Sequence, residues 1–196
     1  MASPHLPEGT VTFLFTDIEG STRLVAEVGD TAYGAILDTE RRLVVDAAVA
    51  EGGVPFGSEG DAHFVAFGSA VAAIRAAVAA QRALAGHAWA AGPVRVRMGI
   101  HSGEVQVAGD DYLGLEVHRV ARIAAAGHGG QVLVSDVTRA LAGDPGVPSR
   151  CAIWASTGSR TWPARSVCSR WRHRASRRCS RPCGRSTPRP TTCRRS

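Results

Sequence analysis

Acidic residues stop at Asp144, and this break limits how much of the chain can form a globular domain. Residues 1–150 contain all 17 acidic residues and 11 arginines, a net charge of −6. Residues 151–196 contain 12 arginines and no acid, a net charge of +12. A segment of about 150 residues can bury one hydrophobic core and hardly two. We therefore predict one domain, residues 1–150, followed by a disordered tail rich in arginine and cysteine, residues 151–196.

The tail accounts for the overall charge of +6, so this charge is no guide to the partners of the domain. All five cysteines lie in the tail, and an odd number without paired Cys-x-x-Cys spacing argues against a zinc site or a disulfide framework. Clustered arginines without an organised aromatic groove argue against nucleic-acid binding by the tail. The cysteines are Cys151, Cys168, Cys179, Cys183 and Cys193.

The N-terminal sequence MASPHLPEGT has neither the charged nor the apolar segment of a signal peptide. No apolar run approaches the roughly 20 residues that a membrane span requires. We therefore expect a cytoplasmic protein without a membrane partner.

Hydrophobic periodicity predicts alternating strands and helices in residues 1–150. Strands are expected at residues 10–15, 54–56, 63–67, 94–107 and 131–134, and helices at 22–51, 70–85, 115–126 and 136–141. The first helix is expected to break near Gly29, and residues 54–67 to form a hairpin with Asp61 in or beside its turn. This order favours an α+β domain with one sheet and helices packed on it.

Two acidic residues are notable for their positions, Asp17 at the end of the first strand and Asp61 in the hairpin turn. Carboxylates brought together at such places suit Mg²⁺ or Mn²⁺ bound with triphosphate oxygens. Backbone N–H groups of Gly20, Ser21 and Thr22 could bind phosphates at the start of the following helix. The alternative is that Asp17 caps this helix and Asp61 only stabilises its turn.

Four segments occur in one order: FLFTDIEGSTRL, EGDAHFVAF, RVRMGIHSGEV and DDYLGLEVHRVARIAAAGHGGQVLVS. Together they resemble the catalytic domain of class III nucleotidyl cyclases, the adenylate and guanylate cyclases. The resemblance implies a ferredoxin-like sheet with helices packed on it. It also implies that ATP or GTP is converted to cyclic AMP or cyclic GMP by attack of the ribose 3′-hydroxyl on the α-phosphate, with release of pyrophosphate.

The resemblance assigns two metal ions, Mg²⁺ or Mn²⁺, to Asp17, Asp61 and the carbonyl of Ile18. It implies a homodimer in which one subunit supplies the metal ligands of each site. The other subunit supplies the groups that read the base and stabilise the transition state.

Other positions keep or depart from the family pattern. Arg122 matches the transition-state arginine, and Asp111 matches the acidic residue that reads the base. Gly57 stands at the place of the base-reading lysine, and the chain has no lysine. His118 stands at the place of the asparagine that orients the ribose. Alternatively, His118 faces solvent, Asp111 stabilises a turn, and Arg122 pairs with an acid, Glu116 or Asp136.

Four further polar residues are assigned no catalytic place. His63, His101 and His128 are interpreted as structural or surface residues. Glu59 is interpreted as a solvent-facing turn residue, with contact to a base as the alternative.

The tail has a second explanation, a shift in reading frame near residues 147–151. Re-read one base earlier, its first part resembles the closing β-hairpin of a cyclase domain and the rest a Pro-rich linker to ATPase or transcriptional-regulator modules. The domain would then lack its C-terminal hairpin. Two functions follow: a metal-dependent nucleotidyl cyclase, or a catalytically impaired module of a transcriptional regulator that binds nucleotide or dimerises.

Overall fold

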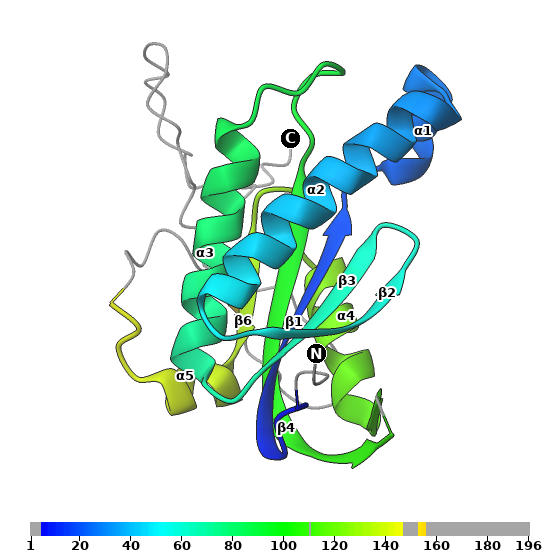
Figure 1. The fold of residues 1–196 in the computed structure, drawn as a ribbon. Helices are drawn as coiled ribbons and strands as arrows, with labels where there is room; N and C mark the ends of the chain where they lie inside the picture. The colour runs from blue at the N-terminus through cyan, green and yellow to red at the C-terminus, as the bar shows by residue number, and fades with distance from the viewer. Residues whose placement is uncertain (1–4, 110, 147–152, 156–196) are drawn as a thin grey trace, which may run out of the picture.

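The computed structural model describes residues 5–109 and 111–146 together with the backbone of residues 153–155. A mixed sheet with strand order β2-β3-β1-β4-β6-β7 forms its centre, and β5 pairs with β4 outside this path (Figure 1). The strands are β1 (Gly9–Ile18), β2 (Val54–Glu59), β3 (Ala62–Phe67), β4 (Val96–Ala108), β5 (Asp111–Leu113), β6 (Val132–Ser135) and β7 (Ile153–Ala155). The helices are α1 (Ser21–Val28), α2 (Asp30–Ala50), α3 (Ala70–Gly86), α4 (Leu115–Ala125) and α5 (Asp136–Ala142).

The first four long strands have the ferredoxin-like order. Strand β1 lies antiparallel between β3 and β4, and β2 pairs antiparallel with β3 at the edge. Strands β6 and β7 extend the sheet in parallel beyond β4. The fold is therefore α+β with helices packed on one sheet, as the sequence predicted.

The predicted break in the first long helix occurs at Gly29. Its φ of 80° lies in the left-handed region, which glycine adopts without a Cβ clash. The Gly29 N–H bonds the Val25 carbonyl at 2.8 Å, and the Gly29 carbonyl accepts from Tyr33 at 3.0 Å. One residue thus ends α1 and begins α2.

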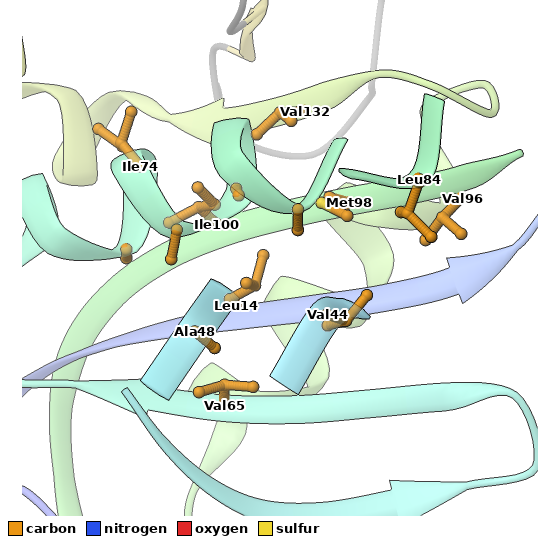
Figure 2. Packing of buried hydrophobic residues seen from close by; sticks show 14 of the residues in the cluster. Leu14, Val44, Ala48, Val65, Ile74, Leu84, Val96, Met98, Ile100 and Val132 are labelled. Atoms are coloured by element: carbon orange, nitrogen blue, oxygen red, sulfur yellow. The ribbon is translucent and has the colours of Figure 1, made fainter. Parts of the chain in front are cut away.

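Helices α2 and α3 cover one face of the sheet and build the main core (Figure 2). Leu14 from β1 packs there with Val44 and Ala48 of α2, and Ile74 of α3 lies beside Ile100 of β4. Burial of a leucine, isoleucine or valine side chain of this kind contributes about 1.5–3 kcal/mol. None of the described helices has the length and apolar character needed to cross a membrane.

Helix α4 packs on the other face of the sheet, over β4. A Cβ at Gly99 would lie 2.6 Å from the Val120 carbonyl oxygen and 2.7 Å from the Ala124 nitrogen. Only glycine permits this close approach of helix and strand. The face also holds a smaller apolar cluster, which consists of Val11, Phe13, Ala66, Tyr112 and Val120.

Two short strands were not predicted. Strand β4 continues past its pairing with β1, which ends at Val105, so residues 106–108 pair instead with β5, where the sequence indicated a turn. Strand β7 pairs with β6 and corrects the expectation that the tail has no regular structure from residue 151. Backbone groups at the exposed edge of β6 explain this pairing. The other predictions for the tail, including its shifted frame and the lost hairpin, lie outside the described residues.

Candidate active site

The end of β1 meets the turn of the β2–β3 hairpin, and this contact brings the predicted metal ligands together. The backbone N–H of Ile18 donates a hydrogen bond to Oδ2 of Asp61 at 3.1 Å. Burial raises the pKa of Asp17, and the neighbouring carboxylate of Asp61 raises this pKa further. The end of β1 and Asp61 are therefore close in space, although 43 positions separate Ile18 from Asp61. The charges of Asp17 and Asp61 act on each other there.

Arg97 supplies a positive charge to this environment. It lies opposite Asp17 in the β1–β4 register, and its Nε donates to Oδ2 of Asp17 at 2.6 Å. A second guanidinium nitrogen contacts the same oxygen, and the two groups form an ion pair. Arg97 lowers the pKa of Asp17, but burial and the neighbouring Asp61 together leave this pKa raised.

Sequence reasoning assigned no role to Arg97. Its importance depends on the antiparallel pairing of two strands 80 positions apart. A register worked out for residues 10–18 against 95–105 could have found it, because cross-strand partners project to the same face of a sheet.

The predicted phosphate-binding segment follows directly on β1. Gly20 is the N-cap of α1 with a φ of 73°, and Ser21 begins the helix. No side chain caps this helix, so the N–H groups of its first turn remain available to a ligand. Thr22 is exposed in that first turn.

The predicted base-reading positions are open to solvent. Gly57 lies in β2 opposite Phe64 of β3, and Phe64 stacks edge to face on Phe15 with ring centroids 4.8 Å apart. Asp111 is the exposed first residue of β5, and its Oδ1 accepts from the Tyr112 N–H at 2.7 Å. The hydrogen bond from the Tyr112 N–H to Asp111 agrees with the alternative that Asp111 stabilises the backbone of its own turn.

Helix α4 presents His118 and Arg122 to solvent. Neither has a hydrogen bond or an ion pair within the described part of the chain. Glu116 binds His101 at 2.6 Å and Arg119 at 2.7 Å, whereas Asp136 pairs with Arg139. The alternative that Arg122 pairs with Glu116 or Asp136 is therefore wrong. Within the described residues, no hydrogen bond or ion pair joins α4 to Asp17 or Asp61.

The remaining histidines have the structural or surface places predicted for them. His101 is buried, and its Nδ1 lies 2.9 Å from Ser135 Oγ. His128 is exposed, 3.8 Å from Glu19. His63 is buried against Glu40, a residue of α2 that sequence reasoning did not single out. Glu59 is exposed at the end of β2, as expected.

The donor chemistry at the end of β1 fits a divalent metal. Two carboxylates and a backbone carbonyl are the hard oxygen ligands that Mg²⁺ and Mn²⁺ prefer. Over residues 5–109 and 111–146, no group of three or more His, Cys, Asp or Glu side chains is arranged to hold a metal ion. A metal here would rely on two side chains, backbone oxygen and ligand oxygens. A groove of about 530 Å³ begins beside this position at Ile18 and Gly20 and continues to Pro93 and Arg95.

The fold and the placing of these motifs define a nucleotidyl cyclase-like domain. The sequence profile of the adenylate and guanylate cyclase catalytic domain matches residues 4–150, and the chain belongs to this family.

Relatives and solved structures agree with this assignment. The chain is 37% identical over 134 residues to an uncharacterized protein of Mycobacterium tuberculosis, covering 67% of this chain and 45% of the relative. It is 32% identical over 155 residues to an adenylate cyclase of Podospora anserina, covering 66% of this chain and 7% of the relative. The chain thus spans less than half the length of these relatives.

Adenylate cyclases from Trypanosoma brucei in their monomeric state superpose with a TM-score of 0.64 at 26% identity, covering 73% of this chain and 80% of theirs. The adenylyl cyclase CyaB from P. aeruginosa superposes with a TM-score of 0.58 at 27% identity, covering 69% of this chain and 81% of that one.

Proposed function

We propose that this domain forms cyclic AMP or cyclic GMP from ATP or GTP, with release of pyrophosphate. The single observation that carries the proposal is the hydrogen bond from Ile18 N–H to Asp61. It joins the strand end to the hairpin turn and so gathers the two carboxylates that the family uses for metal binding.

Asp17, Asp61 and the Ile18 carbonyl would hold the two divalent ions, Mg²⁺ or Mn²⁺. When bound, these ions neutralise charge on the triphosphate and polarise the reacting phosphorus. Burial raises the pKa of Asp17 most, and Asp61 adds to the cost of keeping Asp17 charged with one arginine as counter-charge. A bound cation would lower that cost, which supports a metal at this position.

Arg97 and the first turn of α1 would bind the triphosphate. The Arg97 guanidinium already lies against Asp17, and its remaining N–H groups suit phosphate oxygens. The uncapped N–H groups at Ser21 and Thr22 add a favourable helix end for an anion.

The complete site would need a second copy of the chain. Arg122 and His118 lack partners among the described residues and make no contact with the acidic pair, which supports their use across a dimer. In this arrangement Arg122 stabilises the transition state, His118 contacts the ribose, and Asp111 reads the base beside Gly57. Exposed Leu113 and Leu115, 61% and 68% accessible, flank the same region and support an interface there.

The alternative function is a catalytically impaired module that binds nucleotide or dimerises. It is favoured by Gly57, which offers no side chain to a base in a chain without lysine, and by His118 in place of an asparagine. Loss of these two contacts would cost several kcal/mol of transition-state stabilisation, a rate reduction of about a thousandfold.

The test is production of cyclic nucleotide from ATP and from GTP with Mn²⁺ by the full chain. Asp17→Asn is the matched variant, because an amide retains the shape of the side chain and a hydrogen bond to Arg97 while removing the charge. We expect product that disappears in this variant. A folded, dimeric protein that binds nucleotide without product would favour the alternative.

A further inference from the structure

A buried polar cluster lies on the opposite face of the sheet from Asp17. It consists of Glu40 on α2, His63 on β3 and Thr16 on β1. Glu40 is fully buried, and its Oε2 lies 2.9 Å from Nε2 of His63. Thr16 is the direct cross-strand partner of His63. Among the described residues, Thr16 Oγ1 and Glu40 Oε1 have no hydrogen-bond partner.

Glu40 interrupts an otherwise apolar face of α2. The buried positions of this helix are Ile36, Glu40, Val44 and Ala48, each four residues after the last. An apolar residue at this position would pack in the core, whereas a carboxylate loses its hydration. Replacement of a buried polar pair of this kind by apolar residues is often neutral or stabilising, so the pair is weak evidence of a role in stability.

The cluster is directly connected to the proposed metal ligands. His63 follows Asp61 by two residues, and Thr16 immediately precedes Asp17. Burial raises the pKa of Glu40 most, His63 lowers it, and the charges of Asp61 and Asp17 raise it further. Glu40 is therefore within electrostatic reach of both metal carboxylates.

The hydrogen bond between Glu40 and His63 joins α2 to the start of β3. Asp61 lies in the hairpin turn directly before β3, and its carboxylate accepts a hydrogen bond from the Ile18 N–H. Movement of His63 away from α2 would shift the turn and lengthen this hydrogen bond. The geometry gives Glu40 a means of setting the position of Asp61 from a place 21 residues earlier in the chain.

We propose that Glu40 is a positioning residue for the metal site, which acts through His63 to hold Asp61 against the end of β1. The proposal rests on the proposed function, because it assumes that Asp61 binds a divalent cation. It adds a residue of the opposite face to the machinery of that site. Glu40 itself contacts neither the metal nor the nucleotide.

The test measures Mn²⁺ binding by the full chain without nucleotide, from the electron paramagnetic resonance signal of free Mn²⁺. In the double variant Glu40→Leu with His63→Leu, apolar side chains replace the pair, and thermal unfolding reports whether the core remains intact. We expect an unchanged or higher unfolding temperature together with an affinity lower by about 10-fold to 100-fold. Glu40→Gln, which keeps a hydrogen bond to His63, should retain affinity within about threefold of the original chain.

The outcomes separate this proposal from the function on which it rests. Asp61→Asn should abolish Mn²⁺ binding; if it does not, the metal site itself is wrong. If Asp61→Asn abolishes binding and the double variant binds like the original chain, only the role of Glu40 is refuted. Equal losses in Glu40→Gln and in the double variant would also refute positioning, since the hydrogen bond would then be irrelevant.

Discussion

Replacement of Gly57 by lysine should raise cyclase activity with ATP. Gly57 lies opposite Phe64, and a Cβ at this position would meet Phe64 Cδ2 at 3.6 Å, an ordinary van der Waals distance. Because cross-strand partners project to the same face, the new side chain would extend over the face that carries Phe15 and Asp17. The backbone of Gly57 is not in the left-handed region, so a side chain is accepted without strain.

The expected gain follows from one charge-assisted hydrogen bond. An ammonium that donates to an adenine acceptor contributes about 1.5–3 kcal/mol, which corresponds to a 10-fold to 150-fold increase in kcat/KM for ATP. Removal of a glycine from a strand should also stabilise the fold by about 0.5–1 kcal/mol. The variant should therefore unfold at the same or a higher temperature.

The assay measures cyclic AMP and cyclic GMP by mass spectrometry after incubation with Mn²⁺ and either ATP or GTP. Gly57→Met is the matched control, because methionine is similar in length and carries no charge. An equal gain in activity in the methionine and lysine variants would refute a role for the charge of lysine. A lysine variant that folds normally and gains no activity would refute it as well.

Two further predictions concern packing and ionisation. Gly99→Ala should destabilise the fold by about 1–3 kcal/mol in chemical denaturation, because its Cβ would meet the backbone of α4, at Val120 and Ala124. Gly34 lies inside α2, and no atom lies within 4 Å of a Cβ added there, so Gly34→Ala should instead stabilise the fold by about 0.5–1 kcal/mol. If both variants changed the free energy of unfolding equally, the close packing of α4 on Gly99 would be contradicted. Burial and then the charge of Glu8 raise the pKa of Tyr112 to about 12, and its hydroxyl donates to the Pro7 carbonyl at 2.8 Å. The raised pKa of Tyr112 contributes stability that is complete below about pH 10 and is lost as the pH rises toward 12. Absorbance at 295 nm in a Tyr33→Phe variant follows the ionisation of Tyr112 and should show a midpoint near 12. A midpoint near 10 would contradict this prediction.

Local sequence signals were sufficient for much of the fold. The break at Gly29 could be read from the chain because a glycine inside a helical pattern favours a change of direction. The turn at Asp61 was readable because Gly60 and Asp61 separate two alternating segments. Strand β5 was not predicted, since its pairing depends on how far β4 extends past β1.

Contacts within the candidate site could be predicted only where they depend on motifs. Asp17, Ile18 and Asp61 were expected together, and the Ile18 to Asp61 hydrogen bond brings them together. Arg97 was missed because its contact follows from strand register, which a motif does not contain. Glu40 was missed although a signal was present: it lies four residues after Ile36 and four before Val44 on an apolar face. A charged residue at such a position indicates a buried partner.

The most direct test of the account is mixing of two inactive variants. Asp17→Asn removes a proposed metal ligand, and Arg122→Ala removes the proposed transition-state group. In the proposed dimer these two groups come from opposite subunits at each site. Each variant alone should form almost no cyclic nucleotide from ATP with Mn²⁺, while an equimolar mixture should recover about a quarter of the original activity through heterodimers with one intact site. A mixture as inactive as its components, beside an active original chain, would contradict the shared site, and an inactive original chain would contradict the cyclase itself.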